Sequence, residues 1–462
     1  ADWIVNHAIE TKRKVIYTAP IKALSNQKFR DYCTLYGEEK VGLVTGDLVI
    51  RRNAPIRVMT TEILRNMLLS GEELSELLAV VVDEIHFLDD RDRGTVWEEV
   101  LIYLPNHVQI IGLSATLSNV REFSSWLSHV RDSEVLVVEE KQRAVPLIVG
   151  FANQQAGLCN RDEFEAAWKK NQSSAHNQQA RPNRDKRKNT KGRGRDTKKR
   201  DRYIRKTRDT QVVQMVVEKD LLPMLYFAFS RRDIEMYARG LMDNTDLDLL
   251  SDREHAQITV ILEQAQTELG TVLSRGLRRL YSRGVAFHHA GLHVQLKVLV
   301  ESLYEKRLIK VLYCTSTFAL GINMPARTVV FDGLKKFNGQ QVAPLAVRQF
   351  MQKAGRAGRR GMDTVGYVFV RMDFEEYGEW KPIIENYQKG LSEPVHSRFS
   401  LSWNSVANLV HQYDKKAVRN LIERSFLNWH FSKEAEKQRL QADSLEEHSK
   451  NDNAPGRRQI KE

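Results

Sequence analysis

Residues 77–86 read Leu-Leu-Ala-Val-Val-Val-Asp-Glu-Ile-His, an apolar run that ends in two carboxylates. Its apolar half predicts a strand buried on both faces, as is typical of a parallel sheet covered by helices. Ligands bind beyond the carboxyl ends of such strands, so Asp83 and Glu84 would lie at the mouth of a site. Asp83 is suited to hold Mg²⁺, and Glu84 to orient and deprotonate an attacking water. Taken alone, however, the stretch is better explained as a strand that ends in surface acids.

The same kind of apolar run recurs along the chain, alternating with helical patterns, and this predicts an α/β fold with two successive parallel-sheet domains. The first half has runs at Lys14–Pro20, Ile56–Thr61, Leu77–Glu84 and Val108–Thr116. The second half has runs at Met224–Ser230, Val285–Ala290, Lys310–Thr317, Arg327–Gly333 and Val365–Met372. We therefore expect domains at 1–150 and 211–390, followed by a helical, polar region whose apolar face includes Trp403, Leu409 and Val410.

Composition places the protein among ordinary globular proteins. Of its 462 residues, 42% are apolar and 28% are charged. No apolar run is long enough to span a bilayer, so we expect no membrane contact. Three separated cysteines (Cys33, Cys159 and Cys314) give neither a disulfide framework nor a zinc site. An intracellular location, with the cytoplasm favoured, and a monomer are the resulting expectations.

The net charge is concentrated in one segment. Residues 181–208 hold fifteen Lys or Arg and three Asp, and 15 − 3 = +12 equals the net charge of the whole chain. The surrounding stretch 154–210 is poor in large apolar residues, which predicts a flexible insertion or linker. Two interpretations of the segment remain open: a phosphate-binding arm, and a solvated linker without a partner.

A second motif favours the catalytic interpretation of Asp83 and Glu84 over the interpretation as surface acids. Residues 352–361 read Gln-Lys-Ala-Gly-Arg-Ala-Gly-Arg-Arg-Gly. Glycines allow close approach of the backbone, and guanidinium groups neutralise charge on a transferring phosphoryl group. A basic surface loop explains the regular interleaving poorly.

With these two motifs, the chain resembles the superkiller-type DExH-box RNA helicases of superfamily two. The resemblance covers about 1–150 and 211–435 and rests on an ordered set of segments, specific as a set though weak one by one. In the first domain these are Thr18–Lys28 (motif Ia), Thr45–Asp47, Thr60–Arg65, Asp83–His86 (motif II) and Ser114–Thr116 (motif III). In the second domain they are Phe229–Arg232 (motif IV), His288–Leu292, Thr315–Ala326 (motif V) and Gln352–Gly361 (motif VI).

The resemblance implies two tandem RecA-like domains that use ATP and Mg²⁺. Glu84 would be the catalytic carboxylate, Asp83 the Mg²⁺ partner, and His86 part of the coupling to the bound strand. Arg356 and Arg359 would reach the γ-phosphate, with Arg359 favoured as the arginine finger. Nucleotide contacts would also come from Gln352, Gly321, Asn323, Ser114 and Thr116. His288 and His289 are better explained as packed core histidines.

The resemblance further implies a single-stranded nucleic acid, preferentially RNA, as partner, with 3′-to-5′ movement and a possible RNA-processing complex. Its contacts to the strand would be sequence-independent contacts to phosphates. The residues implied are Thr18, Pro20, Lys22, Thr45, Gly46, Asp47, Thr60, Thr61, Arg65, Arg231, Thr315 and Thr317. The hydroxyls among them are, individually, as easily explained as helix caps.

The sequence departs from the family in several places. Neither Gly-Lys-Thr nor Gly-Lys-Ser occurs in the 462 residues, so the family's phosphate loop would have to precede Ala1. Without it we expect the chain alone to be a poor ATPase. Motif V has Ser316 where many relatives carry an acid. Residues 395–433 would be a partial winged-helix domain, and 434–462 a charged tail.

Two other functions remain possible on the sequence alone. A DNA-repair helicase of the same superfamily shares motifs II, III and VI, although Ile21–Lys28 and Arg359-Arg360-Gly361 favour the RNA branch. A non-catalytic RNA-binding scaffold would have no chemical use for Asp83, Glu84 and the motif VI arginines.

Overall fold

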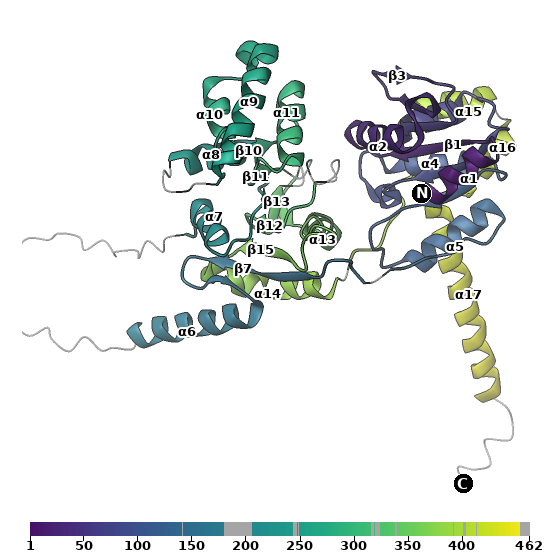
Figure 1. The fold of residues 1–462 in the computed structure, drawn as a ribbon. Coiled ribbons are helices and arrows are strands. Elements are labelled where there is room, and N and C mark those ends of the chain that lie inside the picture. The colour runs from purple at the N-terminus through teal and green to yellow at the C-terminus, as the bar shows by residue number, and fades with distance from the viewer. Residues whose placement is uncertain are drawn as a thin grey trace, which may run out of the picture. The chain divides into compact units, whose positions relative to one another are not determined.

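The computed structural model describes residues 1–452 apart from 141, 180–205, 244–246, 248, 316–317, 319–323, 338–339, 391, 401–402 and 413. The chain forms two compact units, one of residues 1–139 and 393–462 and one of residues 140–392 (Figure 1). Among the described residues, no helix combines the length and apolar character needed to cross a membrane. Most of the basic segment 181–208 lies outside the described residues, as do Thr317, Gly321 and Asn323.

The first unit is built on a sheet in the order β3-β2-β4-β1-β5-β6, parallel except for the β2–β3 pair. Its strands are β1 (Lys14–Ala19), β2 (Val41–Val44), β3 (Val49–Ile50), β4 (Ile56–Thr60), β5 (Leu77–Val82) and β6 (Gln109–Gly112). Its helices are α1 (Asp2–Glu10), α2 (Lys22–Tyr36), α3 (Thr61–Leu69), α4 (Gly94–Tyr103) and α5 (Val120–Arg131), with 3₁₀ turns η1 (Glu38–Lys40) and η2 (Ile85–Asp89). Strand β5 is buried along nearly its whole length, as the apolar run predicts.

The second unit has a larger sheet in the order β10-β11-β9-β12-β15-β7-β8, parallel except for the β7–β8 pair. Its strands are β7 (Leu147–Asn153), β8 (Gly157–Cys159), β9 (Met224–Phe227), β10 (Val285–His288), β11 (Val311–Cys314), β12 (Thr328–Phe331) and β15 (Gly366–Arg371), and β13 (Lys335–Phe337) and β14 (Val342–Pro344) form a separate hairpin. Its helices are α6 (Arg161–Gln179), α7 (Asp209–Glu218), α8 (Arg231–Asp243), α9 (Asp252–Leu269), α10 (Arg275–Tyr281), α11 (Val294–Glu305), α13 (Val347–Ala354) and α14 (Phe374–Lys389), with a 3₁₀ turn η3 (Gly270–Val272). Two tandem α/β domains of the RecA-like class are therefore confirmed.

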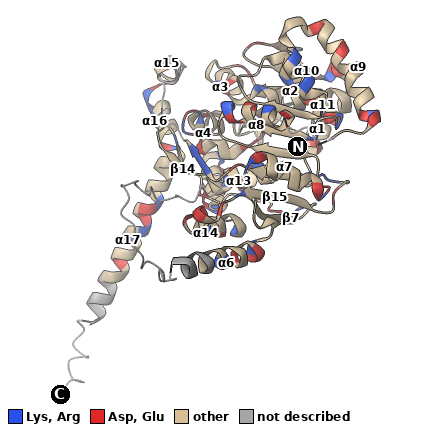
Figure 2. Ribbon diagram, turned by 90° about the vertical axis from the view of Figure 1, so that its left-hand side faces the viewer, with Lys and Arg blue, Asp and Glu red and all other residues tan. Residues whose placement is uncertain are grey.

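Three C-terminal helices, α15 (Trp403–Gln412), α16 (Lys415–Glu423) and α17 (Phe426–Asp452), belong to the first unit. The indole Nε1 of Trp126 donates to the Arg424 carbonyl at 2.9 Å, and the Phe426 ring packs on Trp126. The apolar face expected in this region is wrong in part, because Trp403 is 90% exposed and Val410 is 66% exposed, while Leu409 is buried. Charged residues of both signs occur along α9 and α17 (Figure 2).

The expected boundary between the domains needs correction. The second unit begins at 140 rather than 211, because β7 pairs with β15 over Gly366–Arg371. Of the stretch 154–210, expected as a flexible insertion or linker, the described residues 154–179 and 206–210 hold β8, helix α6 and the start of α7. Its few large apolar residues suffice because Phe164 and Trp168 lie one helical turn apart and both pack against Tyr377.

Candidate functional site

Asp83 follows β5 at the carboxyl edge of the first sheet. Its Oδ2 accepts a hydrogen bond from the Tyr17 hydroxyl at 2.6 Å, and its Oδ1 accepts from the backbone N–H of Glu84 at 2.9 Å. Burial raises the pKa of Asp83 above its ordinary value, although the hydrogen bond from Tyr17 opposes this. The carboxylate is thus fixed in orientation at the edge where ligands of parallel sheets bind.

Glu84 adopts an unusual backbone conformation, with φ +51° and ψ +47° in the left-handed region. Such a conformation costs about 1–3 kcal/mol for a residue other than glycine and is found disproportionately at functional sites. The turn brings the Oε2 of Glu84 to 3.4 Å from Nδ1 of His86. The Nδ1 atom also lies 3.4 Å from the backbone nitrogen of Ala115. His86 therefore joins the segment after β5 to the segment 114–116 after β6, while the side chains of Ser114 and Thr116 are exposed.

The residues around Asp83 fit a Mg²⁺ ion of the kind expected. Mg²⁺ is usually held by one or two carboxylates together with water and substrate phosphates, so a complete protein cage is not required. Burial disfavours the charge of the Asp83 carboxylate, the charge of Lys28 only partly offsets this, and a divalent cation would stabilise the carboxylate further. The described residues hold no cluster of three or more His, Cys, Asp or Glu that could bind a metal.

Three of the segments expected to contact a nucleic-acid strand follow the β-strands β1, β4 and β2. These β-strands are neighbours in the sheet. The Nζ of Lys22 lies 3.0 Å from Oδ1 of Asp47, and the hydrogen bond from Lys22 lowers the pKa of Asp47. Both side chains are more than half exposed. Lys22, Gly46 and Asp47 therefore form one surface at the carboxyl edge of the sheet.

Several residues expected to contact the nucleic acid have buried side chains. Thr18 and Thr61 are fully buried, and their hydroxyls donate to the carbonyls of Val81 and Ala19 at 3.3 and 3.5 Å. Pro20 is buried, and its carbonyl accepts from Arg93 at 2.8 Å. Side chains alternate between the two faces of a strand, so residues at a strand end need not be accessible. Thr18, Thr61 and Pro20 support the strand ends instead.

The remaining first-unit candidates are mostly occupied by internal contacts. Thr45 and Thr60 are 5% and 6% exposed, and the Thr45 hydroxyl donates to Asp47 at 2.9 Å. Arg65 lies 3.6 Å from the buried carboxylate of Glu99. A pocket of about 360 Å³ opens beside this region, lined by Val44, Thr45, Gly46, Val49, Arg52, Arg57, Met59, Ile63, Asn66, Met67, Ser70 and Glu72.

In the second unit, the backbone of motif VI is fixed against the start of β12. Ala326 donates to the Arg356 carbonyl at 2.9 Å, and Gly358 donates to the Ala326 carbonyl at 2.8 Å. Gly358 has φ +84°, and a Cβ there would lie 2.5 Å from Cγ1 of Val145. A glycine is therefore required at 358 for both the turn and the close packing.

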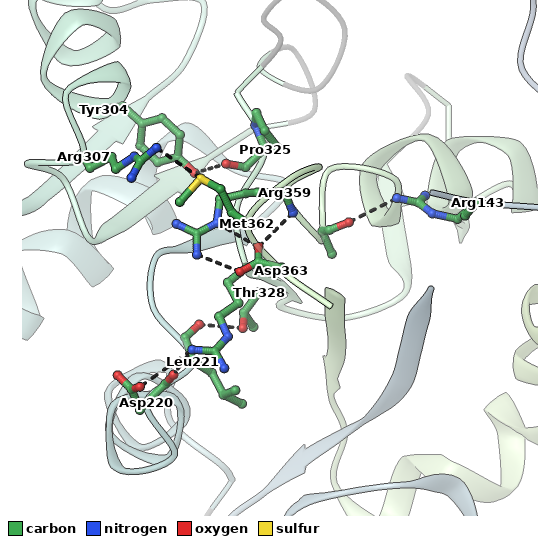
Figure 3. A network of polar contacts seen from close by, with 12 residues as sticks. Arg143, Asp220, Leu221, Tyr304, Arg307, Pro325, Thr328, Arg359, Met362 and Asp363 are labelled. Carbon is green, nitrogen blue, oxygen red and sulfur yellow. Dashed lines mark hydrogen bonds and ion pairs between the residues drawn. The ribbon is translucent and has the colours of Figure 1, made fainter. Parts of the chain in front are cut away.

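Arg359 is held by a carboxylate of its own loop. Its Nε and Nη2 donate to the two oxygens of Asp363 at 2.8 Å each, and its backbone N–H donates to Oδ2 at 2.8 Å (Figure 3). These hydrogen bonds lower the pKa of Asp363 and raise that of Arg359. Asp363 is nearly buried, with 5% of its side chain exposed. Arg359 is therefore oriented before any ligand binds.

The other candidates of the second unit lie at the carboxyl ends of β9, β10 and β11. Arg231 begins α8, and a Cβ on Gly291 would lie 3.0 Å from its Nη1. His288 and His289 are buried, in agreement with their interpretation as packed histidines. Nε2 of His288 lies 3.0 Å from Oε1 of Glu301, and Nε2 of His289 lies 3.1 Å from Oε1 of Glu235. The backbone N–H of Thr315 donates to the His288 carbonyl at 3.2 Å. Gln352 is partly buried on α13.

Three residues of the site were missed from the sequence. Tyr17 holds Asp83 across a separation of 66 residues, and Arg143 bonds to the motif VI loop from 214 residues away. No local pattern indicates such distant contacts. Asp363 had a signal, since it lies four residues after Arg359 at the spacing of a local ion pair.

Comparisons with known proteins find a helicase domain in each of the two units. The family model described as DEAD/DEAH box helicase matches residues 3–123, and the helicase conserved C-terminal domain matches residues 244–361. These ranges contain the Asp83–Ala115 site and the motif VI loop.

Curated relatives match almost the whole chain. The probable helicase HelY of Mycobacterium tuberculosis is 38% identical over 447 residues, which is 93% of this chain and 48% of the relative. The human exosome RNA helicase MTR4 is 36% identical, over 92% of this chain and 40% of the relative. The antiviral helicase SKI2 of Saccharomyces cerevisiae is 33% identical, over 92% of this chain and 36% of the relative. The chain thus spans about half of these relatives or less. It carries the two helicase domains of superfamily two, and the relatives that it matches include superkiller-type RNA helicases.

Proposed function

We propose that the full-length protein is an ATP-dependent RNA helicase that moves 3′ to 5′ on single-stranded RNA and separates duplexes during RNA processing or decay. The observation that carries the proposal is the position of His86, whose Nδ1 lies 3.4 Å from both Oε2 of Glu84 and the backbone nitrogen of Ala115. His86 can therefore connect a carboxylate suited to hydrolysis to a neighbouring loop, as a motor needs. Similarity to proteins named exosome RNA helicase and antiviral helicase supports RNA as the substrate.

The chemistry would be divided between the two units. Glu84 orients a water and accepts its proton, while Asp83 holds the Mg²⁺ ion that neutralises charge on the phosphates. Arg356 and Arg359 stabilise charge on the γ-phosphate, and Gln352, Gly321 and Asn323 contact the nucleotide. Ser114 and Thr116 transmit the state of the nucleotide to the strand-binding surface.

Binding of the nucleic-acid strand would use the exposed residues among those predicted to contact it. Lys22, Gly46 and Asp47 lie together, and Arg231 is exposed at the start of α8. These residues would contact phosphates rather than bases, so binding would be independent of sequence. Further contacts would come from Arg65, the Thr45 and Thr60 loops and the motif V hydroxyls of Thr315 and Thr317. An intracellular protein that joins an RNA-processing complex is part of this proposal.

A phosphate-binding loop is also part of the proposal. The 462 residues contain no Gly-Lys-Thr or Gly-Lys-Ser, so this polypeptide alone should hydrolyse ATP poorly. A protein in which such a loop precedes Ala1, called the full-length protein below, should hydrolyse ATP in an RNA-dependent way.

The test compares ATP hydrolysis and unwinding by the full-length protein on matched substrates. We expect single-stranded RNA to stimulate hydrolysis more than DNA of the same sequence. We also expect unwinding of an RNA duplex with a 3′ overhang but not of one with a 5′ overhang. Stimulation by DNA alone would replace the RNA assignment with the DNA-repair helicase, and RNA binding without hydrolysis would indicate a non-catalytic scaffold.

A further inference from the structure

Arg143 lies against the motif VI loop. The second unit begins at residue 140, so Arg143 is among its first residues. Its Nη2 donates to the carbonyls of Gly355 and Ala357 at 3.2 and 3.1 Å, and its Nε donates to the Val145 carbonyl at 3.1 Å. Gly355 and Ala357 are the two neighbours of Arg356. One guanidinium group therefore holds the backbone on both sides of that arginine.

The charge of Arg143 has no acidic partner. Within the part of the chain that the structure describes, no carboxylate lies within ion-pair distance of its guanidinium. Burial lowers the pKa of Arg143, but an arginine remains protonated under any ordinary condition. Its hydrogen bonds go to neutral carbonyls, so its positive charge remains unpaired beside the backbone of Arg356.

The packing around Arg143 explains why its guanidinium can approach the motif VI loop. A Cβ on Gly355 would lie 3.4 Å from Nη1 of Arg143, and a Cβ on Gly358 would lie 2.5 Å from Val145. The Pro146 carbonyl accepts from the backbone N–H of Gly366 at 2.9 Å, where β7 begins to pair with β15. Residues 143–147 thus run beside the motif VI loop and into the sheet.

We propose that Arg143 is a positioning residue for ATP hydrolysis, which fixes the backbone from which Arg356 extends and adds a third positive charge near the phosphate-binding arginines. The proposal rests on the function proposed above for motif VI. Arg143 holds the Gly355 carbonyl before Arg356 and the Ala357 carbonyl after it, so the Cα of Arg356 starts from one position and less reorganisation is needed when charge develops on the γ-phosphate.

The first experiment compares Arg143→Lys with the unchanged full-length protein. Lysine keeps the charge but lacks the planar fork that bonds to three carbonyls at once. We expect kcat for RNA-stimulated ATP hydrolysis to fall about tenfold, with KM for ATP within about twofold. The control is Arg161→Lys on α6, whose guanidinium bonds to Glu165, Glu385 and Gln388 and should leave kcat unchanged.

A purely structural role would give a different result. It would reduce the yield of folded protein. It would leave kcat per folded molecule unchanged by Arg143→Lys, both with and without Arg356→Ala. A positioning role predicts that Arg143→Lys has little further effect once Arg356 is removed.

The second experiment measures hydrogen exchange in the 462-residue chain. The amides of Ala357 and Gly358 donate to Ala354 and Ala326 at 2.9 and 2.8 Å, and Arg143→Lys should accelerate their exchange while the amides of β9 are unaffected. Faster exchange with reduced kcat supports the proposal. Unchanged kcat overturns it, whatever the exchange rates. An inactive unchanged protein overturns the proposed function instead, so the two failures are distinguishable.

Discussion

The Nδ1 atom of His86 lies 3.4 Å from the backbone nitrogen of Ala115, which donates a hydrogen bond to it. The same atom lies 3.4 Å from Oε2 of Glu84. An unprotonated Nδ1 accepts from the amide, and a protonated Nδ1 donates to the carboxylate, so the two hydrogen bonds exclude each other. His86 can therefore change its partner when the surroundings of Glu84 change.

Removal of the His86 imidazole should uncouple ATP hydrolysis from RNA binding. In His86→Ala of the full-length protein, we expect basal hydrolysis to remain and stimulation by RNA to fall about tenfold, the scale of a typical coupling free energy. Steady-state ATPase assays with and without RNA measure this ratio. His129→Ala, on the exposed face of α5, is the matched control. Full stimulation in His86→Ala would exclude His86 as the coupling residue.

The carboxylate of Glu84 should be required for turnover but not for binding. Glu84→Gln preserves the shape of the side chain and removes its ability to accept a proton. We expect kcat to fall about 10²- to 10⁴-fold, the usual contribution of a general base, with unchanged affinity for RNA. Glu10→Gln on α1 serves as the control. If Glu84→Gln hydrolyses ATP at the unchanged rate, another group must be the base.

Asp363 should fix the orientation of Arg359. Asp363→Asn keeps one acceptor but loses the anion that both guanidinium nitrogens contact at 2.8 Å. We expect kcat to fall about tenfold, and the Arg359 amide, which donates to Asp363, to exchange faster by a similar factor. Exchange-detected mass spectrometry and ATPase assays give the two readouts. A variant with the original exchange rate at Arg359 would show that the ion pair is not what holds it.

The sequence predicted the elements whose signal is local. Each of the nine predicted strands corresponds to an observed one, because runs such as Leu77–Val82 are continuous and apolar. Strand β2 was missed because Gly42 interrupts its pattern, yet glycine is needed there, since a Cβ would lie 2.2 Å from the Arg51 carbonyl. Strand β7 was missed because its partner β15 lies more than 200 residues away.

The candidate site was predictable only to the level of the segment. The pattern located Asp83, Glu84 and motif VI, since acids after a buried strand and interleaved glycines are local features. It could not say which hydroxyls face outward, so buried Thr18 and Thr61 were included. The contacts of Tyr17 and Arg143 depend on the tertiary fold and have no local signal.

The basic segment 181–208 should contribute most of the salt dependence of RNA binding. Replacing it with a neutral Gly-Ser linker of equal length removes its net charge of +12. Each lost phosphate contact reduces the slope of log K against log salt by about 0.7 for a single strand, so we expect a reduction of about 2 or more. Fluorescence anisotropy at several salt concentrations measures the slope. A shuffled segment of the same composition should restore it, whereas an equal slope in all three proteins would identify the segment as a linker.

Burial of Glu98 on α4 makes the stability of the first unit depend on pH. Its Oε2 accepts from the Ser397 hydroxyl at 2.7 Å and its Oε1 from the Phe426 amide at 2.6 Å, so it ties the C-terminal segment to α4. Burial raises its pKa from the ordinary value of 4.5 to about 7. The folded state therefore binds a proton that the unfolded state releases, and this stabilisation is complete below pH 4.5 and is lost as pH rises through about 7.

Glu98→Gln should remove this dependence, because glutamine can accept from the Phe426 amide and donate to the Ser397 hydroxyl without ionising. We expect its free energy of unfolding to fall less than that of the unchanged chain between about pH 4.5 and 7, as measured by urea unfolding followed by tryptophan fluorescence. Glu76→Gln, which removes an exposed ion pair with Lys14, should retain the full dependence. Parallel curves for Glu98→Gln and the unchanged chain would mean that Glu98 is already ionised in the folded protein, with its charge stabilised by the two hydrogen bonds.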